Sequence, residues 1–442
     1  MKTPKNPRNI VIIDDVPPEA NAMLQALYSR SPKSVTEHLA QIKERGADKF
    51  MSIYYVEYGH KSIGDCGTTS IFVEQVSMLV AKAVQDWPLY SGQEASTRYL
   101  DMASQDVLNP IGSVEGEEIQ DAWMAFYVHA LEELVPVLKL RFPIQKGQKE
   151  GVYEKAIKAR AFDIARGFLP AGATTLAAWH TNLRQASDHL KEMRHHPLAE
   201  VREVADAVTN ELKAKYKSSF LHKEYPEQEA YLDKSMSKFA YFDDPSIKAF
   251  SYRSRLDLEG LSVHQNLLAE RPAKSELHNR FRQYGDIVFS FPLDFGSYRD
   301  LQRQRSAVQE MPLLTTRYGF FPWYLEQLPE TLRAEAEALI KTQEARIAKL
   351  VDANGAPVAD EVKQYYTAMG YTVTVKMSCS LPSAVYIAEL RSANTVHPTL
   401  RVEAQRMGDA IAECVPGIAM HHDRSPGIWN IKRGAQDIVR VA

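Results

Sequence analysis

Cysteine is scarce in this chain of 442 residues, and the three that occur are Cys66, Cys379 and Cys414. Their number is odd and no two form a Cys-x-x-Cys pair, so the sequence predicts neither a disulfide framework nor a zinc site. Cys66 stands in the segment GDCGTT, where it could act as a nucleophile. A small, partly buried thiol is the simpler interpretation.

Long apolar runs and a strong net charge are also missing. No stretch approaches the roughly 18 apolar residues that a membrane span needs, and the N-terminal segment turns acidic at Asp14 before a signal-peptide core could form. The 53 Lys and Arg nearly balance the 56 Asp and Glu, which gives no global electrostatic reason to expect a nucleic-acid partner. We therefore expect a cytoplasmic protein without a membrane or nucleic-acid partner, long enough for two or three domain-sized units.

Helical periodicity dominates the rest of the chain. The clearest amphipathic patterns run over residues 117–142, 154–169 and 329–355. Residues 68–87 predict a strand that continues into a helix, and residues 9–14 predict a short strand. The patterns together predict a helix-rich chain with a few strands.

Segments of the first half recur in the second half in the same order. Residues 67–87 can be laid without a gap on residues 285–305, and STRY at residues 96–99 echoes TTRY at residues 315–318. Further along, Arg194 and Arg391 each stand shortly before a His-Pro step. Three matches in one order favour a duplicated domain.

The boundary between the two copies is expected near residue 240, which predicts domains over residues 1–240 and 241–442. The paired arginines could instead cap helices ahead of the His-Pro turns. The His-His-Pro run at residues 195–197 is weak evidence for a metal site, and no metal site is expected.

One polar segment, SGQEASTRY at Ser91–Tyr99, carries the densest chemistry. It sets a carboxylate, a hydroxyl and a guanidinium within five residues, at Glu94, Ser96 and Arg98. Acceptors at one end and donors at the other suit a nucleotide base and its phosphate. A polar surface loop with a weak Arg–Glu pair has the same composition.

The same segment resembles the flavin-dependent thymidylate synthases, whose signature reads RHRxxSxNExSxRY. Ser91, Glu94, Ser96, Arg98 and Tyr99 match it, with Gln93 in place of Asn. The resemblance includes GHKS at residues 59–62, IARGFLP with Arg166, NLR at residues 182–184, and Arg194. It covers most of residues 10–215 and, more loosely, residues 250–420.

The resemblance implies an α+β fold made of two tandem copies of a helix-rich domain around antiparallel sheet. Family members are normally homotetramers with each active site between subunits, so a duplicated chain is expected to form a homodimer, a pseudo-tetramer. They use FAD, reduced by NADPH, to move a one-carbon unit from methylenetetrahydrofolate to C5 of dUMP without a cysteine nucleophile. The expected partners are therefore a pyrimidine nucleotide, dUMP, and folate.

The two halves depart from the family pattern in complementary ways. Asp86, Trp87 and Pro88 hold the place of the RHR triplet in the first half, whereas the second half keeps it as RQR at residues 303–305. The ExSxR cradle is intact only in the first half. The resemblance therefore implies one composite site per chain and a reciprocal site that is dead.

The expected site residues come from both halves. Substrate binding is expected of Glu94, Ser96, Arg98 and Arg166 in the first half and of Gln302 and Arg303 in the second. Catalysis is expected of Arg391, which completes the composite site, and of Arg194. Flavin binding is expected of Ser62, Asn182, Arg184, Arg303, Gln304 and Arg305. In the second half Cys379 and Leu381 are expected opposite Asn182 and Arg184, which disfavours a second flavin site.

Two alternatives remain open. Replacement of RHR by RQR could accompany a related flavin-dependent modification of another pyrimidine nucleotide. The chain could also be a catalytically silent nucleotide-binding protein that kept the fold and lost the chemistry.

Overall fold

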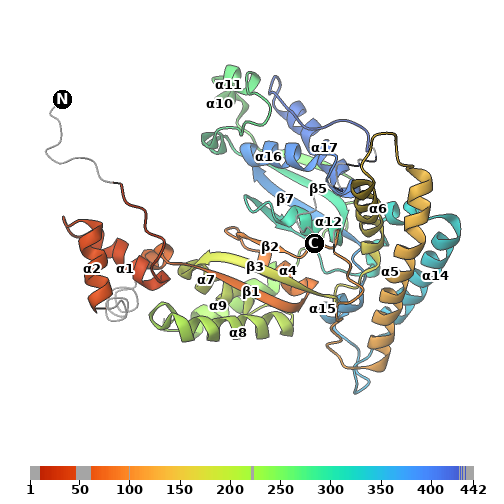
Figure 1. The fold of residues 1–442 in the computed structure, drawn as a ribbon, viewed down its shortest axis with the longest axis horizontal. Coiled ribbons are helices and arrows are strands. Elements are labelled where there is room, and N and C mark those ends of the chain that lie inside the picture. The colour runs from red at the N-terminus through yellow and green to blue at the C-terminus, as the bar shows by residue number, and fades with distance from the viewer. Residues whose placement is uncertain are drawn as a thin grey trace. The chain divides into compact units, whose positions relative to one another are not determined.

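The computed structural model describes residues 10–45, 61–98, 100–220 and 223–427, together with residues 429, 431 and 434. Within them the chain forms two compact units (Figure 1). The first unit comprises residues 1–72, 89–93 and 178–237, and the second comprises residues 73–88, 94–177 and 238–442. No helix of the described residues is both long and apolar enough to cross a membrane.

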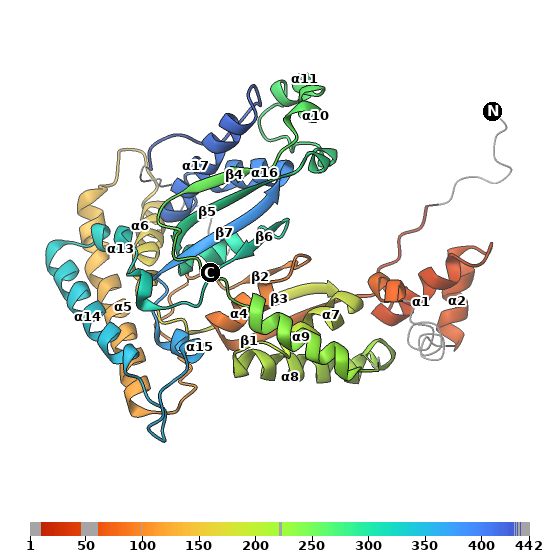
Figure 2. The ribbon, with the colours of Figure 1, turned by 180° about the vertical axis from the view of Figure 1, so that it is seen from behind.

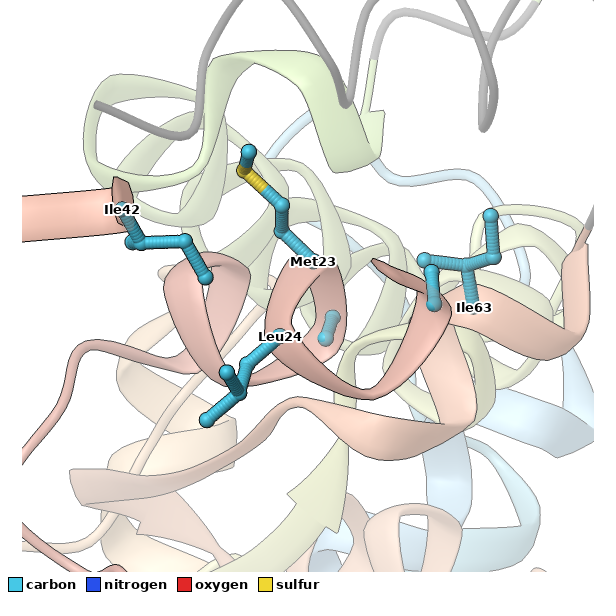
Figure 3. Packing of buried hydrophobic residues seen from close by; sticks show 6 residues of the cluster. Met23, Leu24, Ile42 and Ile63 are labelled. Carbon is cyan, nitrogen blue, oxygen red and sulfur yellow. The ribbon is translucent and has the colours of Figure 1, made fainter. Parts of the chain in front are cut away.

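The first unit contains two short N-terminal helices, α1 (Pro18–Tyr28) and α2 (Val35–Arg45). Met23, Leu24, Ile42 and Ile63 belong to a small buried cluster that joins these helices to η2 (Lys61–Cys66), as Figure 3 shows. The strand expected at residues 9–14 is wrong for residues 10–14, which are extended but pair with no strand. Ile10 and Ile12 are more than four-fifths exposed there, and the packing of Ile13 against the small buried cluster is not sufficient to hold a strand.

The remaining helices of the first unit follow a strand. They are α7 (Leu183–Met193), α8 (Ala199–Lys215), η4 (Lys217–Phe220) and most of α9 (Pro226–Phe239). The buried carboxylate of Glu19 on α1 accepts hydrogen bonds from the backbone N–H and the hydroxyl of Ser219, at 3.0 and 2.6 Å. These two hydrogen bonds fix η4 on α1.

The second unit is built on a four-stranded antiparallel sheet of order β4-β5-β7-β6 (Figure 2). Its central pair, β5 (Asp286–Asp294) and β7 (Thr372–Ser380), runs in the register Asp286↔Ser380 to Asp294↔Thr372. The edge strands are β4 (Ser251–Ser254) and β6 (Ala307–Glu310). Helices α12 (Phe295–Gln302), α16 (Leu381–Arg391) and α17 (Pro398–Cys414) pack against β5.

Long helices cover another part of this unit. α5 (Val114–Arg141) lies along α6 (Glu150–Ala165) and α14 (Glu330–Ala348) (Figure 1). These three helices correspond to the three amphipathic patterns of the sequence, so those predictions are confirmed. Residues 68–87 likewise form β1 (Thr68–Ser77) followed by α4 (Met78–Gln85), as predicted. The expected helix-rich α+β class is confirmed.

The order of elements is the same in two stretches of the chain. The first runs β1, α4, β2 (Gly92–Glu94), α5, α6, η3 (Arg166–Phe168), β3 (Thr174–Asn182), α7 and α8. The second runs β5, α12, β6, α14, α15 (Asp360–Lys363), η7 (Gln364–Tyr366), β7, α16 and α17, with short additional helices between. The strand order β1-β3-β2 is matched by β5-β7-β6. This agreement supports the expected duplication.

The element bounds correct the predicted alignment by one residue in two places. β1 has ten residues and β5 has nine, and β1 contains Gln75 with a φ of 56°, a left-handed conformation that is uncommon outside glycine. The extra residue shifts the gapless alignment, so the matching residues are Asp86, directly after α4, and Arg303, directly after α12. Arg391 ends α16 where Met193 ends α7, so Arg194 is not its counterpart.

The two stretches meet through reciprocal backbone hydrogen bonds in the second unit. Ala171 N–H donates to Thr367 O at 2.9 Å, and Met369 N–H donates to Leu169 O at 2.8 Å. Pro170 and Ala368 form an antiparallel bridge between these bonds. Since each bond joins positions that the element order makes equivalent, the contact is self-complementary, as at a two-fold axis.

A second reciprocal pair flanks the first and requires glycine. Gly172 N–H donates to Tyr365 O at 3.0 Å, and Gly370 N–H donates to Gly167 O at 2.7 Å. A Cβ on Gly172 would lie 2.7 Å from Tyr365 O, and one on Gly370 would lie 2.7 Å from Gly167 O. Only a residue without a side chain permits this close backbone approach.

Candidate functional site

The candidate site lies within the second unit, where α12 directs charged side chains toward the segment after β2. Asp294, the last residue of β5, caps α12 by accepting a 2.9 Å hydrogen bond from Ser297 N–H. Helical spacing then places Arg299 and Arg303 four residues apart on one face. The strand, the capping residue and the helix follow one another without a connecting loop, and this fixes the positions of the two arginines relative to β5.

Glu94, at the end of β2, is the first carboxylate of the site. Its side chain is completely buried and is paired with Arg299. Gln85 Nε2 donates to it at 2.7 Å, and an Arg303 guanidinium nitrogen lies 3.8 Å away. A buried carboxylate is tolerated only when it is paired in this way.

Asp300 is the second carboxylate, and it lies among four guanidinium groups. Its Oδ2 is 3.8 Å from Arg98 Nη1 and 3.7 Å from Arg166 Nη1, and it accepts no hydrogen bond. Burial raises the pKa of Asp300, but Arg98, Arg166, Arg303 and Arg391 outweigh burial and lower this pKa to about 2. Asp300 is therefore a fixed negative charge at neutral pH.

Arg98 is oriented by two partners besides Asp300. Its Nε donates to Asp163 on α6 at 2.9 Å, and its Nη2 donates to the carbonyl oxygen of Thr395 at 2.8 Å. The Asp163 side chain is fully buried. Since Thr395 and Asp163 belong to distant parts of the sequence, Arg98 ties the α16–α17 connection to α6.

Arg166, at the start of η3, has a buried side chain. Its Nη2 donates to Ser297 Oγ at 2.8 Å and lies 3.9 Å from Asp294 Oδ1. Burial opposes the charge of Arg166, but Tyr324, Asp300 and Asp294 outweigh burial and raise its pKa. Arg166 is therefore held as a cation inside the protein.

A hydroxyl network completes the support of Arg166. Asp294 accepts 2.6 Å hydrogen bonds from Tyr324 and Thr399, and Ser297 Oγ lies 2.8 Å from Thr399 Oγ1 and 3.1 Å from His397 Nδ1. His397 Nε2 lies 3.1 Å from the carbonyl oxygen of Asp163, an arrangement in which Nε2 donates. Burial and nearby arginines hold the pKa of His397 well below its usual value, so the ring is neutral.

Arg391, at the end of α16, lies beside the same cluster. Its Nη2 donates to the backbone oxygen of Asp300 at 2.7 Å. With the Gln304 amide oxygen turned toward it, Arg391 also donates to Gln304 at 2.8 and 3.2 Å. The pKa of Arg391 is lowered, chiefly by burial.

The cavity that these residues enclose has a volume of only about 10 Å³, roughly the space of one water molecule. We call it the arginine pocket. Its lining includes Glu94, Ser96, Arg98, Arg166, Arg299, Asp300 and Arg303. A nucleotide cannot enter until internal ion pairs separate, so any anion must compete with Glu94 and Asp300 for the guanidinium groups.

Most of the expected substrate residues come together here. Glu94, Ser96, Arg98, Arg166 and Arg303 line the arginine pocket. Gln302 points elsewhere, since its amide donates to Lys82 O at 2.9 Å. Arg305 is exposed.

Sequence reasoning missed three acidic or basic residues of the cluster: Asp163, Arg299 and Asp300. The spacing of Arg299 and Arg303 was a usable signal, because residues four apart share a helix face. The partner of Arg299 was not readable from local sequence, because Glu94 is 205 residues away.

Other expected residues belong to the first unit. Arg194 donates to Glu224 at 3.0 Å, and Ser62 is exposed. Asn182 caps α7 through its side-chain oxygen, which accepts from Gln185 N–H at 2.8 Å. Gly59, His60 and Tyr99 lie outside the described residues.

Among the expected flavin-binding residues, Arg184 has donors that suit an anionic cofactor. Arg184 uses Nε to bind Asp65 at 2.8 Å, and among the described residues its two terminal nitrogens have no partner. About a third of the side chain is exposed, which fits a phosphate contact at the surface. Element order places Ser380 and Pro382, rather than Cys379 and Leu381, opposite Asn182 and Arg184.

Residues 12–216 match the family model described as thymidylate synthase complementing protein. This segment of the chain is similar to that family. The thymidylate synthase complementing segment contains Glu94, Arg98 and Arg166, and the family supports a flavin-dependent, thymidylate synthase-like role in nucleotide biosynthesis.

Similarity to whole proteins extends beyond the thymidylate synthase complementing segment. A UPF0159 protein of Chlamydia muridarum is 25% identical over 420 residues, covering 81% of this chain and 77% of the relative. A UPF0159 protein of Thermoplasma acidophilum is 23% identical over 470 residues, covering 90% and 93%. The alignments with these relatives therefore extend over both halves of the chain.

Replacing Asp300 tests the electrostatic centre of the arginine pocket. Because its pKa in the folded protein is about 2, lower than in an unfolded chain, its charge stabilises the fold above pH 4, and this contribution is lost as the pH falls through 2. Asp300→Asn should lower the free energy of unfolding by about 2 kcal/mol at pH 7 and by roughly half as much at pH 3. Urea unfolding at both pH values measures it.

The matched control is Asp360→Asn, which removes an exposed carboxylate paired with Lys363 and should cost less than about 0.5 kcal/mol. An Asp300→Asn variant as stable as the parent at pH 7 would mean that desolvation of Asp300 cancels the attraction of the arginines.

Proposed function

We propose that the arginine pocket binds the phosphate of a pyrimidine nucleotide, dUMP, in a flavin-dependent thymidylate synthase reaction. The observation that carries the proposal is the Asp300 carboxylate surrounded by Arg98, Arg166, Arg303 and Arg391. A cluster that already holds one internal anion has the charge and the donors to hold a phosphate. Glu94 and Ser96 supply acceptors beside the donors, which suits the base edge.

The proposed reaction moves a methyl unit from methylenetetrahydrofolate to C5 of dUMP, with NADPH as reductant. Bound FAD would supply the hydride chemistry, and Ser62, Asn182, Arg184, Arg303, Gln304 and Arg305 are the residues proposed to hold it. Arg391 and Arg194 are the proposed catalytic arginines. A guanidinium group stabilises negative charge that develops on an ionised uracil, and Arg391 is held beside the arginine pocket by the Asp300 carbonyl.

One such site per chain is proposed, because the reciprocal site lacks the counterparts of Asp300, Arg166 and Arg303. Element order puts Lys82, Ala83 and Asp86 in the places of Arg299, Asp300 and Arg303. Gln364 takes the place of Arg166 and bonds Tyr241 at 3.0 Å. These replacements support a duplicated chain, with domains over residues 1–240 and 241–442, in which one copy of the site has decayed.

The reaction is tested directly with the purified full chain. Flavin absorbance at no more than one FAD per chain is expected, together with release of tritium from [5-³H]dUMP when methylenetetrahydrofolate and NADPH are present. Absence of both flavin and tritium release would favour a silent nucleotide-binding protein. Bound flavin without tritium release from dUMP, but with turnover of another pyrimidine nucleotide, would mean that the site is correct and that its substrate is the other nucleotide.

Arginine variants test whether the pocket binds the nucleotide. Arg98→Lys and Arg303→Ala should each weaken dUMP binding about 10- to 100-fold, because a lost charge-assisted hydrogen bond costs about 1.5–3 kcal/mol. Lysine at position 98 keeps the charge beside buried Asp163 and protects the fold. Calorimetric titration measures the affinities, and thermal melting checks folding.

Arg317→Ala is the control for these variants, since Arg317 is exposed and pairs only with Asp243 and the ring of Tyr318. Its dUMP affinity should stay within about twofold of the parent. Equal losses from all three substitutions would argue against the arginine pocket as the binding site.

The proposed assembly is a homodimer in the cytoplasm. A duplicated chain supplies two of the four subunit equivalents of the family, so one further chain closes the same symmetric arrangement. Light scattering on the full chain should give the mass of two chains. A stable monomer, or a tetramer of full chains, would contradict the pseudo-tetramer.

A further inference from the structure

A second and much larger cavity lies in the second unit, with a volume of about 580 Å³. It is bounded by the C-terminal end of α5, by α6, by α13 (Pro322–Gln327) and by the first half of α17. It shares no lining residue with the arginine pocket. We call it the Arg160 cavity, and its size is within the range of small-molecule sites.

One wall carries two arginines that no carboxylate neutralises. Arg160 Nη2 donates to Gln327 Oε1 at 3.1 Å, and Arg141 Nη1 and Nη2 lie 3.4 Å from the Gln327 backbone oxygen. Neither arginine forms an ion pair within the part of the chain that the structure describes. Burial, with Arg141 and Arg98 nearby, lowers the pKa of Arg160 to about 10. Such a pair of donors is suited to an anion.

An aromatic surface adjoins these arginines. The Arg160 guanidinium lies 5.2 Å from the centre of the Trp323 ring, a cation–π distance. Trp323 is itself held edge-on by His397 and Tyr324, with ring centres at 4.8 and 5.2 Å. A flat, fixed indole beside positive charge is suited to a stacked planar ring.

A further wall presents a buried acceptor. Glu403 on α17 is 4% exposed, and its Oε1 accepts from Arg406 at 2.7 Å. Its Oε2 is buried and accepts no hydrogen bond. An unsatisfied buried oxygen costs free energy until a donor reaches it, and burial raises the pKa of Glu403 to about 7.

We propose that the Arg160 cavity is a second nucleotide site, separate from the arginine pocket. The phosphate would bind Arg141 and Arg160, the base would stack on Trp323, and an N–H on the base edge would donate to Glu403 Oε2. Binding of a nucleoside phosphate needs three features, and one cavity of adequate volume has all three. They are two unneutralised arginines, a fixed aromatic face and an unsatisfied acceptor. This inference does not depend on the reaction proposed above.

Binding of GMP, AMP and inorganic phosphate to the full chain tests the proposal by calorimetric titration. GMP is the sharpest probe because its base edge offers adjacent N–H donors to a carboxylate. At least one of the two nucleotides should bind, and inorganic phosphate should bind at least tenfold more weakly than that nucleotide. No nucleotide binding at millimolar concentration, or phosphate binding as tight as that of both nucleotides, would overturn the proposal.

Variants locate the binding. Arg160→Gln should weaken binding of the nucleotide that binds the parent by at least tenfold. Glu403→Gln should weaken it by at least fivefold. Lys139→Gln removes a positive charge near the same end of α5, where Lys139 pairs with Glu154, and should change the affinity less than twofold. Arg141→Gln replaces Arg160→Gln if that variant fails to melt cooperatively.

The arginine pocket supplies the last control. Arg303→Ala should leave nucleotide binding at the Arg160 cavity unchanged while it weakens dUMP binding at the arginine pocket. Failure of the proposal for one site therefore does not imply failure of the proposal for the other. Unchanged affinity in both Arg160→Gln and Glu403→Gln would overturn the assignment of this cavity. Loss of binding in Arg303→Ala alone would assign the nucleotide to the arginine pocket instead.

Discussion

The charge of Asp300 is the constraint on which the rest of the arginine pocket depends. Removing a carboxylate from water is costly unless cations compensate for the lost hydration, and here the compensation comes from four guanidinium groups at once. Arg98 follows β2, Arg166 begins η3, and Arg391 ends α16. A single, partly buried charge therefore fixes segments that are far apart in the sequence. The neutral His397 and the hydroxyls around Asp294 hold Arg166 without adding charge.

The reciprocal backbone contact explains how the proposed duplication tolerates one decayed site. Hydrogen bonds between residues 167–172 and 365–370 use main-chain groups, so they persist whatever side chains stand nearby, provided that Gly172 and Gly370 are retained. The arginine pocket, in contrast, depends on the identity of particular side chains. Arg166 on one side of this contact and Gln364 on the other occupy matching places, yet only the arginine meets an acidic partner from α12. Symmetry of the backbone and asymmetry of the sites are therefore compatible.

Sequence patterns predicted the long helices but not the partners of the charged side chains. The helices at α5, α6 and α14 follow from apolar periodicity, and the grouping of Glu94, Ser96, Arg98, Arg166 and Arg303 around one cavity follows the motif that suggested them. The one-residue shift after Gln75 was hidden, because a left-handed residue inside a strand leaves no compositional mark. Asp300 was missed because its surroundings, rather than its neighbours in sequence, make it central. Residues 10–14 have strand-like composition but no partner strand, and composition alone does not supply one.

The near absence of free volume in the arginine pocket bears on what it can select. Glu94 and Asp300 already occupy the guanidinium groups, so an incoming monoanion would exchange one carboxylate contact for another and gain little. A phosphate group carries up to two charges and three terminal oxygens, and so offers more acceptors than the aspartate it competes with. The internal carboxylates therefore disfavour binding of weak anions, whereas a phosphate group can still compete for the guanidinium groups. The Arg160 cavity differs in both respects, because within the described residues Arg141 and Arg160 have no carboxylate to displace and the cavity volume is about 580 Å³.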